Sequence, residues 1–179
     1  IPDNAFSNSS ITSIDIPSSV VSIGNSAFES CTSLAGNLIL PNGLQSIGDN
    51  AFRLCKKLTG DLRIPNSVIN LGHHAFNNCG FTALTLGTGI TAIPQYCFSN
   101  GYSFTGNLII PDQVEVIEEG AFRSCTFNGY LTLGSGLQSI GSFAFSGSSS
   151  GHFNKIYCKA TNPPALSSAL NYENYCEYL

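Results

Sequence analysis

The 179-residue sequence contains no methionine and no tryptophan, and only 10% of its residues are charged. Basic residues are especially scarce, because 7 lysines and arginines stand against 11 acidic residues and leave a net charge of −4. A nucleic acid or an anionic membrane surface needs a basic face on its partner to neutralise phosphate. We therefore expect no nucleic-acid partner and no electrostatic attachment to a membrane.

Long hydrophobic runs are missing as well. A membrane-spanning helix requires about 18 consecutive apolar residues, and no such stretch occurs, so we expect no membrane insertion by this chain. The sequence starts at Ile1 without the charged and apolar segments of an export signal. Because residues 1–6 align with residues 23–28, we expect the sequence to start within a repeat.

What the sequence has in abundance is repetition. SIGNSAFESC at residues 22–31 returns as SIGDNAFRLC at 46–55 and more loosely as NLGHHAFNNC at 70–79. The marker phenylalanines of these segments follow one another at intervals of 22 to 24 residues and are Phe6, Phe28, Phe52, Phe76, Phe98, Phe122 and Phe145. A period of this length is typical of a solenoid, in which each coil packs only on its neighbours. We expect about seven coils of 22–25 residues.

A second marker is a triplet with two apolar outer residues and a variable middle residue. Its first member lies 14 residues before the marker phenylalanine. The distance from a phenylalanine to the next triplet varies between 8 and 10 residues, and it is 11 residues from Phe145 to the last strand position, Ile156. The outer members are Ile14 and Ile16, Leu38 and Leu40, Leu62 and Ile64, Leu84 and Leu86, Leu108 and Ile110, and Leu131 and Leu133. A period of two places the outer members in the core and the middle one in solvent. Each triplet therefore predicts one strand of a parallel sheet.

The segments around the marker phenylalanines predict short helical turns on the other side of each coil. Phe28 and Cys31 are three residues apart, and residues three apart share one face of a helix. Asn25 and Asp49 are expected to cap these turns. We expect these turns, with extended segments beside them, on the convex side.

The seven cysteines allow three interpretations. Cys31, Cys55, Cys79 and Cys125 share one repeat column, and no CxxC pair occurs. Zinc sites use clustered pairs, and a disulfide would require neighbouring coils to bring two sulfur atoms into a specific geometry. The even spacing favours the third interpretation, in which free buried thiols fill the core. We expect no metal and no cofactor.

The segment IDIPSSVVSIGNSAFESC at residues 14–31 resembles the BspA-like leucine-rich repeat, also called the Treponema pallidum type. The resemblance extends from residue 1 to about residue 158. It implies a curved repeat solenoid with a parallel β-sheet on the concave face. It also implies export to the surface of bacteria and adhesion to host proteins or other cells, and it brings no catalytic residues. Pro94 and Cys97 depart from the glycine and alanine of the pattern.

The repeat ends near residue 158. We expect residues 1–158 to form the solenoid and residues 159–179 to form a C-terminal cap or the beginning of a further unit.

The repeat pattern leaves two columns of strand residues free to vary. They are the middle residues of the triplets and the residues just before the strands, which line up across the predicted concave sheet. The candidate partner-binding residues in these columns are Asp15, Ile39, Asp61, Arg63, Thr85, Ile109, Tyr130, Thr132 and Tyr157. Exposed aromatic, aliphatic and arginine side chains suit a binding surface. The same residues also suit a solvated surface of good strand formers.

We interpret the chain as a monomeric, non-enzymatic recognition or adhesion module outside a bacterial cell. Its partner would be an extracellular protein or glycan, such as host matrix or another cell surface, bound through the concave sheet. The alternative is a structural spacer that presents another domain of the parent protein.

Overall fold

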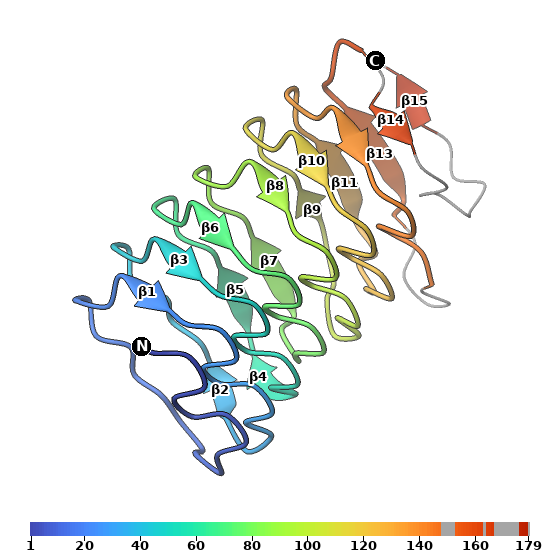
Figure 1. Cartoon of the computed structure of the whole chain (residues 1–179). Helices are drawn as coiled ribbons and strands as arrows, with labels where there is room; N and C mark the ends of the chain where they lie inside the picture. The colour runs from blue at the N-terminus through green and yellow to red at the C-terminus, as the bar shows by residue number, and fades with distance from the viewer. Residues whose placement is uncertain (148–152, 163, 167–175, 179) are drawn as a thin grey trace.

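The computed structural model describes residues 1–147, 153–162, 164–166 and 176–178. The chain winds into a stack of coils that runs from the blue N-terminal residues to the red C-terminal residues (Figure 1). Every strand pairing among the described residues is parallel and joins residues one repeat apart, as Ile23 pairs with Ile47 and Leu62 with Leu84. The predicted parallel solenoid is thereby confirmed.

Strands of two residues each lie along one side of the stack, which we call the short-strand face. They are β1 (Ser22–Ile23), β3 (Ser46–Ile47), β6 (Asn70–Leu71), β8 (Ala92–Ile93), β10 (Val116–Ile117), β12 (Ser139–Ile140) and β14 (Ala165–Leu166). They pair in the orders β1-β3-β6 and β14-β12-β10-β8. The sequence predicts only extended segments here, because two residues are too few to show an alternating pattern.

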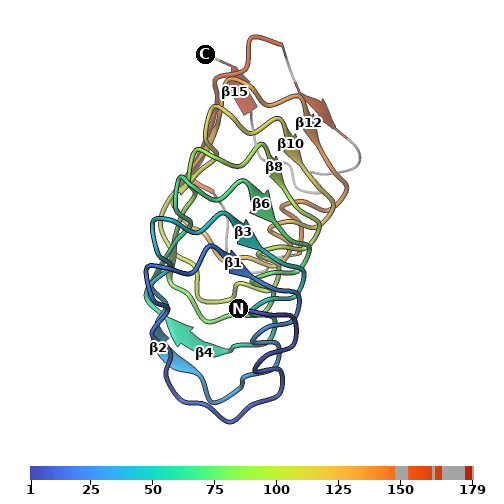
Figure 2. The same ribbon diagram turned by 60° about the vertical axis from the view of Figure 1, so that its left-hand side comes forward.

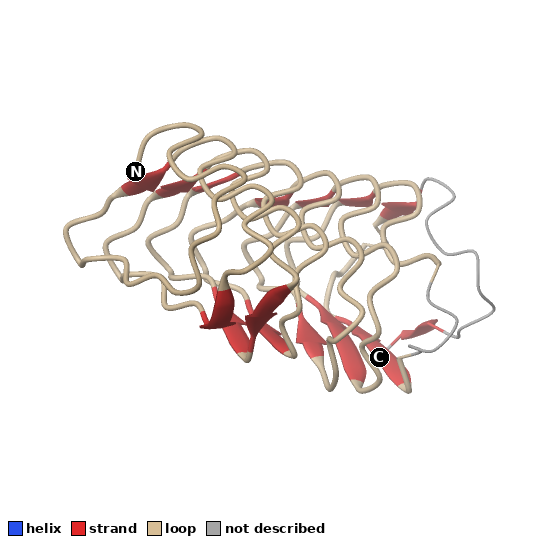
Figure 3. Cartoon of the chain, turned by 90° about the horizontal axis from the view of Figure 1, so that it is seen from below, coloured by secondary structure: helices blue, strands red, loops and turns tan. Residues whose placement is uncertain are grey.

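The predicted triplets supply the opposite side of the coils, which we call the long-strand face (Figure 3). Its strands are β5 (Asp61–Arg63), β7 (Ala83–Thr85), β9 (Leu108–Ile109), β11 (Tyr130–Leu133) and β13 (Lys155–Cys158), which β15 (Cys176–Tyr178) extends. Two further strands, β2 (Ala35–Asn37) and β4 (Lys57–Thr59), pair with each other just before the triplets of their coils. The triplets at 14–16 and 38–40 lie outside any strand, which corrects the prediction for these two coils.

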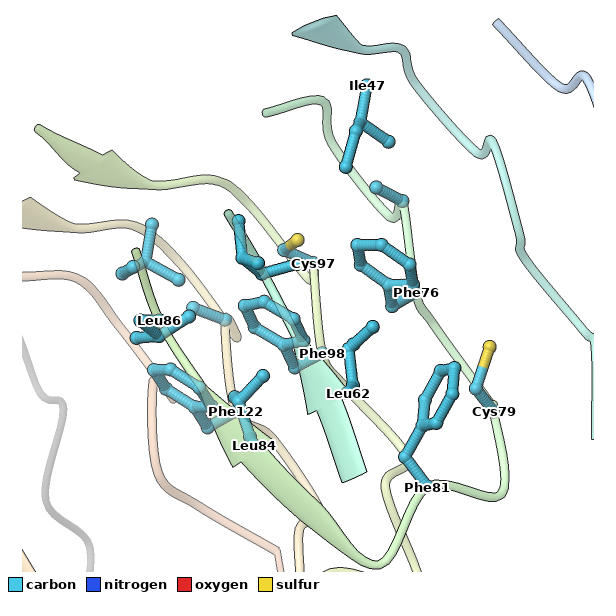
Figure 4. Packing of buried hydrophobic residues seen from close by; sticks show 14 of the residues in the cluster. Ile47, Leu62, Phe76, Cys79, Phe81, Leu84, Leu86, Cys97, Phe98 and Phe122 are labelled. Carbon is cyan, nitrogen blue, oxygen red and sulfur yellow. The ribbon is translucent and has the colours of Figure 1, made fainter. Parts of the chain in front are cut away.

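Figure 2 shows the coils stacked one upon the next. Inside this stack, the core is built from columns of similar apolar residues, one from each coil. The marker phenylalanines form a continuous stack, in which Phe76 lies 5.4 Å from Phe52 and 5.8 Å from Phe98 between ring centroids, with nearly parallel planes. Figure 4 shows Phe76, Phe98 and Phe122 in line, with Leu62, Leu84 and Leu86 beside them. This column belongs to the core, since its five inner members, Phe28, Phe52, Phe76, Phe98 and Phe122, are at most 2% exposed.

The cysteine column is also buried, as the sequence predicts. Cys31, Cys55, Cys79 and Cys125 are free thiols in the core. Each Sγ donates a hydrogen bond to a marker phenylalanine of the preceding coil, as in Cys55 to the carbonyl oxygen of Phe28 at 3.1 Å. Burial raises the pKa of the Cys55 and Cys125 thiols to about 12. These cysteines therefore act as packing residues that also join one coil to the next.

The predicted helical turns are wrong, because no helix occurs among the described residues. The segments around the marker phenylalanines contain two left-handed residues four positions apart, such as Ser26 (φ 51°) and Ser30 (φ 58°), and an α-helix of L-residues is right-handed throughout. Successive N–H groups donate hydrogen bonds alternately to an acceptor within the same coil and to an acceptor in the next coil. The Ala27 N–H closes a turn on Gly24, and the Phe28 N–H donates to Ala51 of the next coil.

This alternation explains why these segments form consecutive turns and not the predicted helical turns. A helical turn would satisfy its backbone within one coil, whereas consecutive turns direct every second N–H toward the neighbouring coil. Asn25 and Asp49 contribute to the same bonding and do not cap their own turns. The Asn25 side chain accepts a hydrogen bond from the N–H of Asp49 at 2.8 Å, and Asp49 accepts one from His73 at 2.7 Å.

Beyond residue 158, β14 and β15 continue the two faces by pairing with β12 and β13. Residues 163, 167–175 and 179 fall outside the described part of the chain, so the assignment of 159–179 as a cap or a further unit stays a prediction. None of the described segments is a helix of the length and apolarity that a membrane crossing demands.

Candidate functional site

Strand alternation on the long-strand face turns the predicted binding residues outward. In β5, Leu62 is buried and Arg63 is exposed, and in β9, Leu108 is buried while 59% of Ile109 is exposed. Asp61 lies in β5, Thr85 in β7, Tyr130 and Thr132 in β11, and Tyr157 in β13. Asp15 and Ile39 are exposed but lie outside the strands.

Parallel register brings these residues into rows across the face. Ile109, Thr132 and Tyr157 form one row, because Thr132 pairs with Ile109 on one side and Tyr157 on the other. Arg63 and Thr85 form an equivalent pair on β5 and β7, and Tyr130 pairs with Lys155 in the neighbouring row. The structure thus unites seven of the nine candidates on five neighbouring strands.

Aromatic and cationic side chains gather at the β11–β13 end of the face. The rings of Tyr130 and Tyr157 meet edge to face at 5.8 Å, and Lys155 Nζ lies 5.0 Å from the centre of the Tyr157 ring. A cation held over an aromatic face is attracted by the ring quadrupole. At the other end, Arg63 and Asp61 form an ion pair. Neither end carries strong net charge.

A groove crosses the face where its hydrogen-bonded ladder is interrupted. Among the described residues β5 pairs with β7 and β9 with β11, while β7 and β9 are not joined in a ladder although they lie side by side (Figure 1). The cavity here has a volume of ≈ 430 Å³. It is lined by the apolar residues Leu84, Leu86, Ile109, Ile110 and Pro111 and by the polar residues Thr85, Thr88, Asn107, Asp112, Gln113 and Lys159.

An ion pair forms part of the lining of the groove. Lys159 Nζ lies 3.6 Å from Asp112 Oδ1, which also accepts a hydrogen bond from the Ser135 N–H at 2.9 Å. This backbone hydrogen bond, helped by Lys159, holds the pKa of Asp112 below its usual range. The pair therefore stays charged at neutral pH and contributes no net charge to the groove.

Asn107, Lys155 and Lys159 belong to this surface but were not predicted as site residues, and the same holds for the groove-lining residues Thr88, Asp112 and Gln113. Asn107 and Lys155 occupy the variable column before the strands, so their positions gave a signal that the selection of candidates overlooked. Lys159 lies beyond the repeat, and only the folding of the last coil brings it to the groove. Within the described residues, no group of three His, Cys, Asp or Glu side chains is placed to hold a metal ion.

The family model of the BspA type leucine rich repeat region matches residues 1–60 and 55–163, in six copies. The chain belongs to this family. The resemblance of the 14–31 segment is thereby confirmed, whereas the predicted count of seven coils is not, because the family model finds six repeats. No curated protein sequence is detectably similar to the chain.

Two solved structures share the fold of the chain. A leucine rich cell surface protein from Faecalibacterium prausnitzii A2-165 is 23% identical, with a TM-score of 0.69 over 89% of this chain and 51% of that one. A leucine-rich repeat protein from Bacteroides ovatus ATCC 8483 is 22% identical, with a TM-score of 0.57 over 82% of this chain and 44% of that one. The chain thus spans about half the length of these relatives in fold.

Proposed function

We propose that the chain is a non-enzymatic recognition or adhesion module of a bacterial cell-surface protein. The observation that carries this proposal is the set of exposed apolar and aromatic residues on and beside the long-strand face. Ile39 is 73% exposed, Ile109 59% and Tyr130 47%, although a solenoid needs no apolar residues at these positions for its core. Aromatic and aliphatic side chains held on a rigid sheet bind a partner at little cost in conformational entropy.

The proposed location rests on the repeat family and on the cell-surface protein from Faecalibacterium prausnitzii that shares the fold. The proposed partner is an extracellular protein or glycan, and the module would bind it as a monomer without a cofactor. The near-neutral face agrees with such a partner, since a chain with 7 basic against 11 acidic residues has few cations with which to neutralise the phosphates of a nucleic acid.

A binding screen tests this proposal. The purified chain would be screened against extracellular-matrix proteins and a glycan array, together with an Ile39/Arg63/Tyr130→Ala variant of the long-strand face. A Val21/Gln45/Ile69→Ala variant provides the matched control, because these three residues are exposed just before β1, β3 and β6 on the short-strand face. We expect binding that only the first variant loses. If the wild-type chain binds nothing, the module is a spacer.

A further inference from the structure

The polar residues of the groove between β7 and β9 have hydrogen-bonding groups to spare. Asn107 Oδ1 accepts a hydrogen bond from the Tyr130 N–H at 2.8 Å, whereas its Nδ2 bonds to no other described residue. The hydroxyl groups of Thr85 and Thr88 and the amide group of Gln113 also have no partner among the described residues. The lining therefore offers a set of neutral donors and acceptors that only water or a ligand fills.

The remainder of the lining is apolar. Leu84 and Leu86 are buried at its base, and Ile109 and Pro111 form part of its wall. Small-molecule sites combine apolar walls with a few polar groups in this way, and the volume of ≈ 430 Å³ lies within their range of about 300–1,000 Å³. A ligand that matches has both C–H surfaces and many hydroxyl groups. Sugar rings have both.

Charge decides between classes of sugar. Asp112 and Lys159 neutralise each other in the lining of the groove, and none of its other lining residues is charged. An acidic sugar would need an unpaired cation, and a basic ligand would need an unpaired carboxylate. The groove supplies neither.

The surface next to the groove extends the site. Ile109 lines the groove and belongs to the row that continues through Thr132 to Tyr157. Tyr130 is exposed there and meets the Tyr157 ring edge to face, while Lys155 Nζ lies over the Tyr157 ring. The exposed Tyr130 ring provides an apolar surface with a polar tip. A chain of sugar units would place one unit in the groove and the next against the tyrosines.

We propose that the groove between β7 and β9 binds a neutral oligosaccharide, which rests on the proposed role of the long-strand face in recognition. Thr85, Asn107 and Gln113 bond its hydroxyl groups, and Ile109 and the tyrosines pack against its C–H faces. A protein partner is the less favoured occupant, because it needs about 800 Å² of buried surface on each side and would leave the polar groups of a recessed groove unpaired.

The test uses the full chain and defined probes. Maltopentaose, cellopentaose, laminaripentaose, xylopentaose and mannopentaose represent neutral oligosaccharides, and heparin fragments and oligogalacturonate represent acidic ones. Affinities measured by titration calorimetry would be compared for the wild type and a Thr85/Gln113→Ala variant. A Thr91/Gln138→Ala variant removes the same two residue types from exposed positions on the short-strand face and serves as the control.

We expect at least one neutral oligosaccharide to bind, with a tenfold or greater loss of affinity in the Thr85/Gln113 variant alone and unchanged thermal unfolding in both variants. Binding of acidic oligosaccharides only, or neutral binding that the groove variant retains, would overturn the groove proposal. If no sugar binds but a protein partner does, and the Ile39/Arg63/Tyr130→Ala variant loses it, the groove proposal fails and the proposed function stands. If the chain binds neither sugars nor proteins, the groove proposal and the proposed function are both overturned.

Discussion

Single residues act in columns in this chain, because each coil places the same side chain over that of its neighbour. The marker phenylalanines have the largest side chains in these columns. Within their column, the ring of each inner member contacts one ring of the coil on either side. Their burial stabilises the stack by about 1.5–3 kcal/mol per residue, but only when the neighbouring coil is folded. Stability is therefore shared between coils.

Phe76→Ala should lower the free energy of unfolding by about 3–5 kcal/mol, as the loss of a buried phenylalanine does. Phe76 is 2% exposed and lies between two other rings. Denaturant unfolding would measure the change. Tyr102→Ala is the control, since Tyr102 is 62% exposed and its loss should stay within about 0.5 kcal/mol. A loss below about 1 kcal/mol for Phe76→Ala would show that the column is not core.

The four column cysteines should react with a thiol reagent only after unfolding. The thiolate is the reactive form, and burial holds the pKa of Cys55 and Cys125 at about 12, above the usual thiol value. Because burial favours the neutral thiol, the contribution of these cysteines to the stability of the folded chain is complete below the pKa of the unfolded thiol. It is lost as the pH rises toward 12. Labelling at pH 8, followed by peptide mass spectrometry, would measure the reactivity of each thiol in the native and the unfolded chain. Rapid labelling of the native chain would contradict this account, as would unreactive thiols in the unfolded chain without reductant.

Leu54→Asn should stabilise the chain by about 1 kcal/mol. Leu54 has a left-handed backbone with φ 65°, a conformation that costs most L-residues about 1–2 kcal/mol and that asparagine tolerates. Asn8, Asn78 and Asn100 occupy the same repeat position with φ near 60°. Thermal unfolding would measure the gain, and the reverse change Asn78→Leu should cost a similar amount. A destabilised Leu54→Asn variant combined with a neutral Asn78→Leu variant would refute the role of backbone conformation.

At the scale of elements, the spacing of residues in the sequence predicted the strands better than it predicted the turns. The constant 14-residue distance from triplet to phenylalanine keeps the outer triplet residues in the core, so β5, β7, β9 and β11 were predictable. The turns were not, because a separation of three residues between Phe28 and Cys31 fits both a helical turn and two consecutive turns. Periodicity indicates which side chains face the core but not the sign of φ at Ser26 or Ser30.

The glycine that begins several of the turn segments, as at Gly24, Gly48, Gly72 and Gly141, allows the coils to approach closely. A Cβ atom on Gly72 would overlap the backbone of Gly48 and Asp49 in the preceding coil. Gly72→Ala should therefore lower the free energy of unfolding by about 1–3 kcal/mol, as overpacking does. Gly43→Ala is the matched control, because its Cβ would lie 3.7 Å from the nearest atom, Ser18 O. Equal stability of the two variants in denaturant unfolding would exclude close coil contact at Gly72.

At the scale of the whole molecule, stacking converts variable residues of separate repeats into a surface. The sequence located most of this surface, because fixed register across parallel strands places Ile109, Thr132 and Tyr157 side by side. It did not locate the groove. That feature depends on an interrupted ladder between β7 and β9 and on Lys159, which follows the last regular repeat. Such features arise from coil-to-coil differences that a repeat pattern averages out.

The central claim is that this surface, and not the opposite one, recognises a partner. Surface plasmon resonance of the partner found in the screen would test it directly, with the wild-type chain and the two face variants immobilised at equal density. The account predicts at least a tenfold loss of affinity for Ile39/Arg63/Tyr130→Ala and less than a twofold change for Val21/Gln45/Ile69→Ala. Equal affinities for both variants, or a loss confined to the short-strand face, would contradict it.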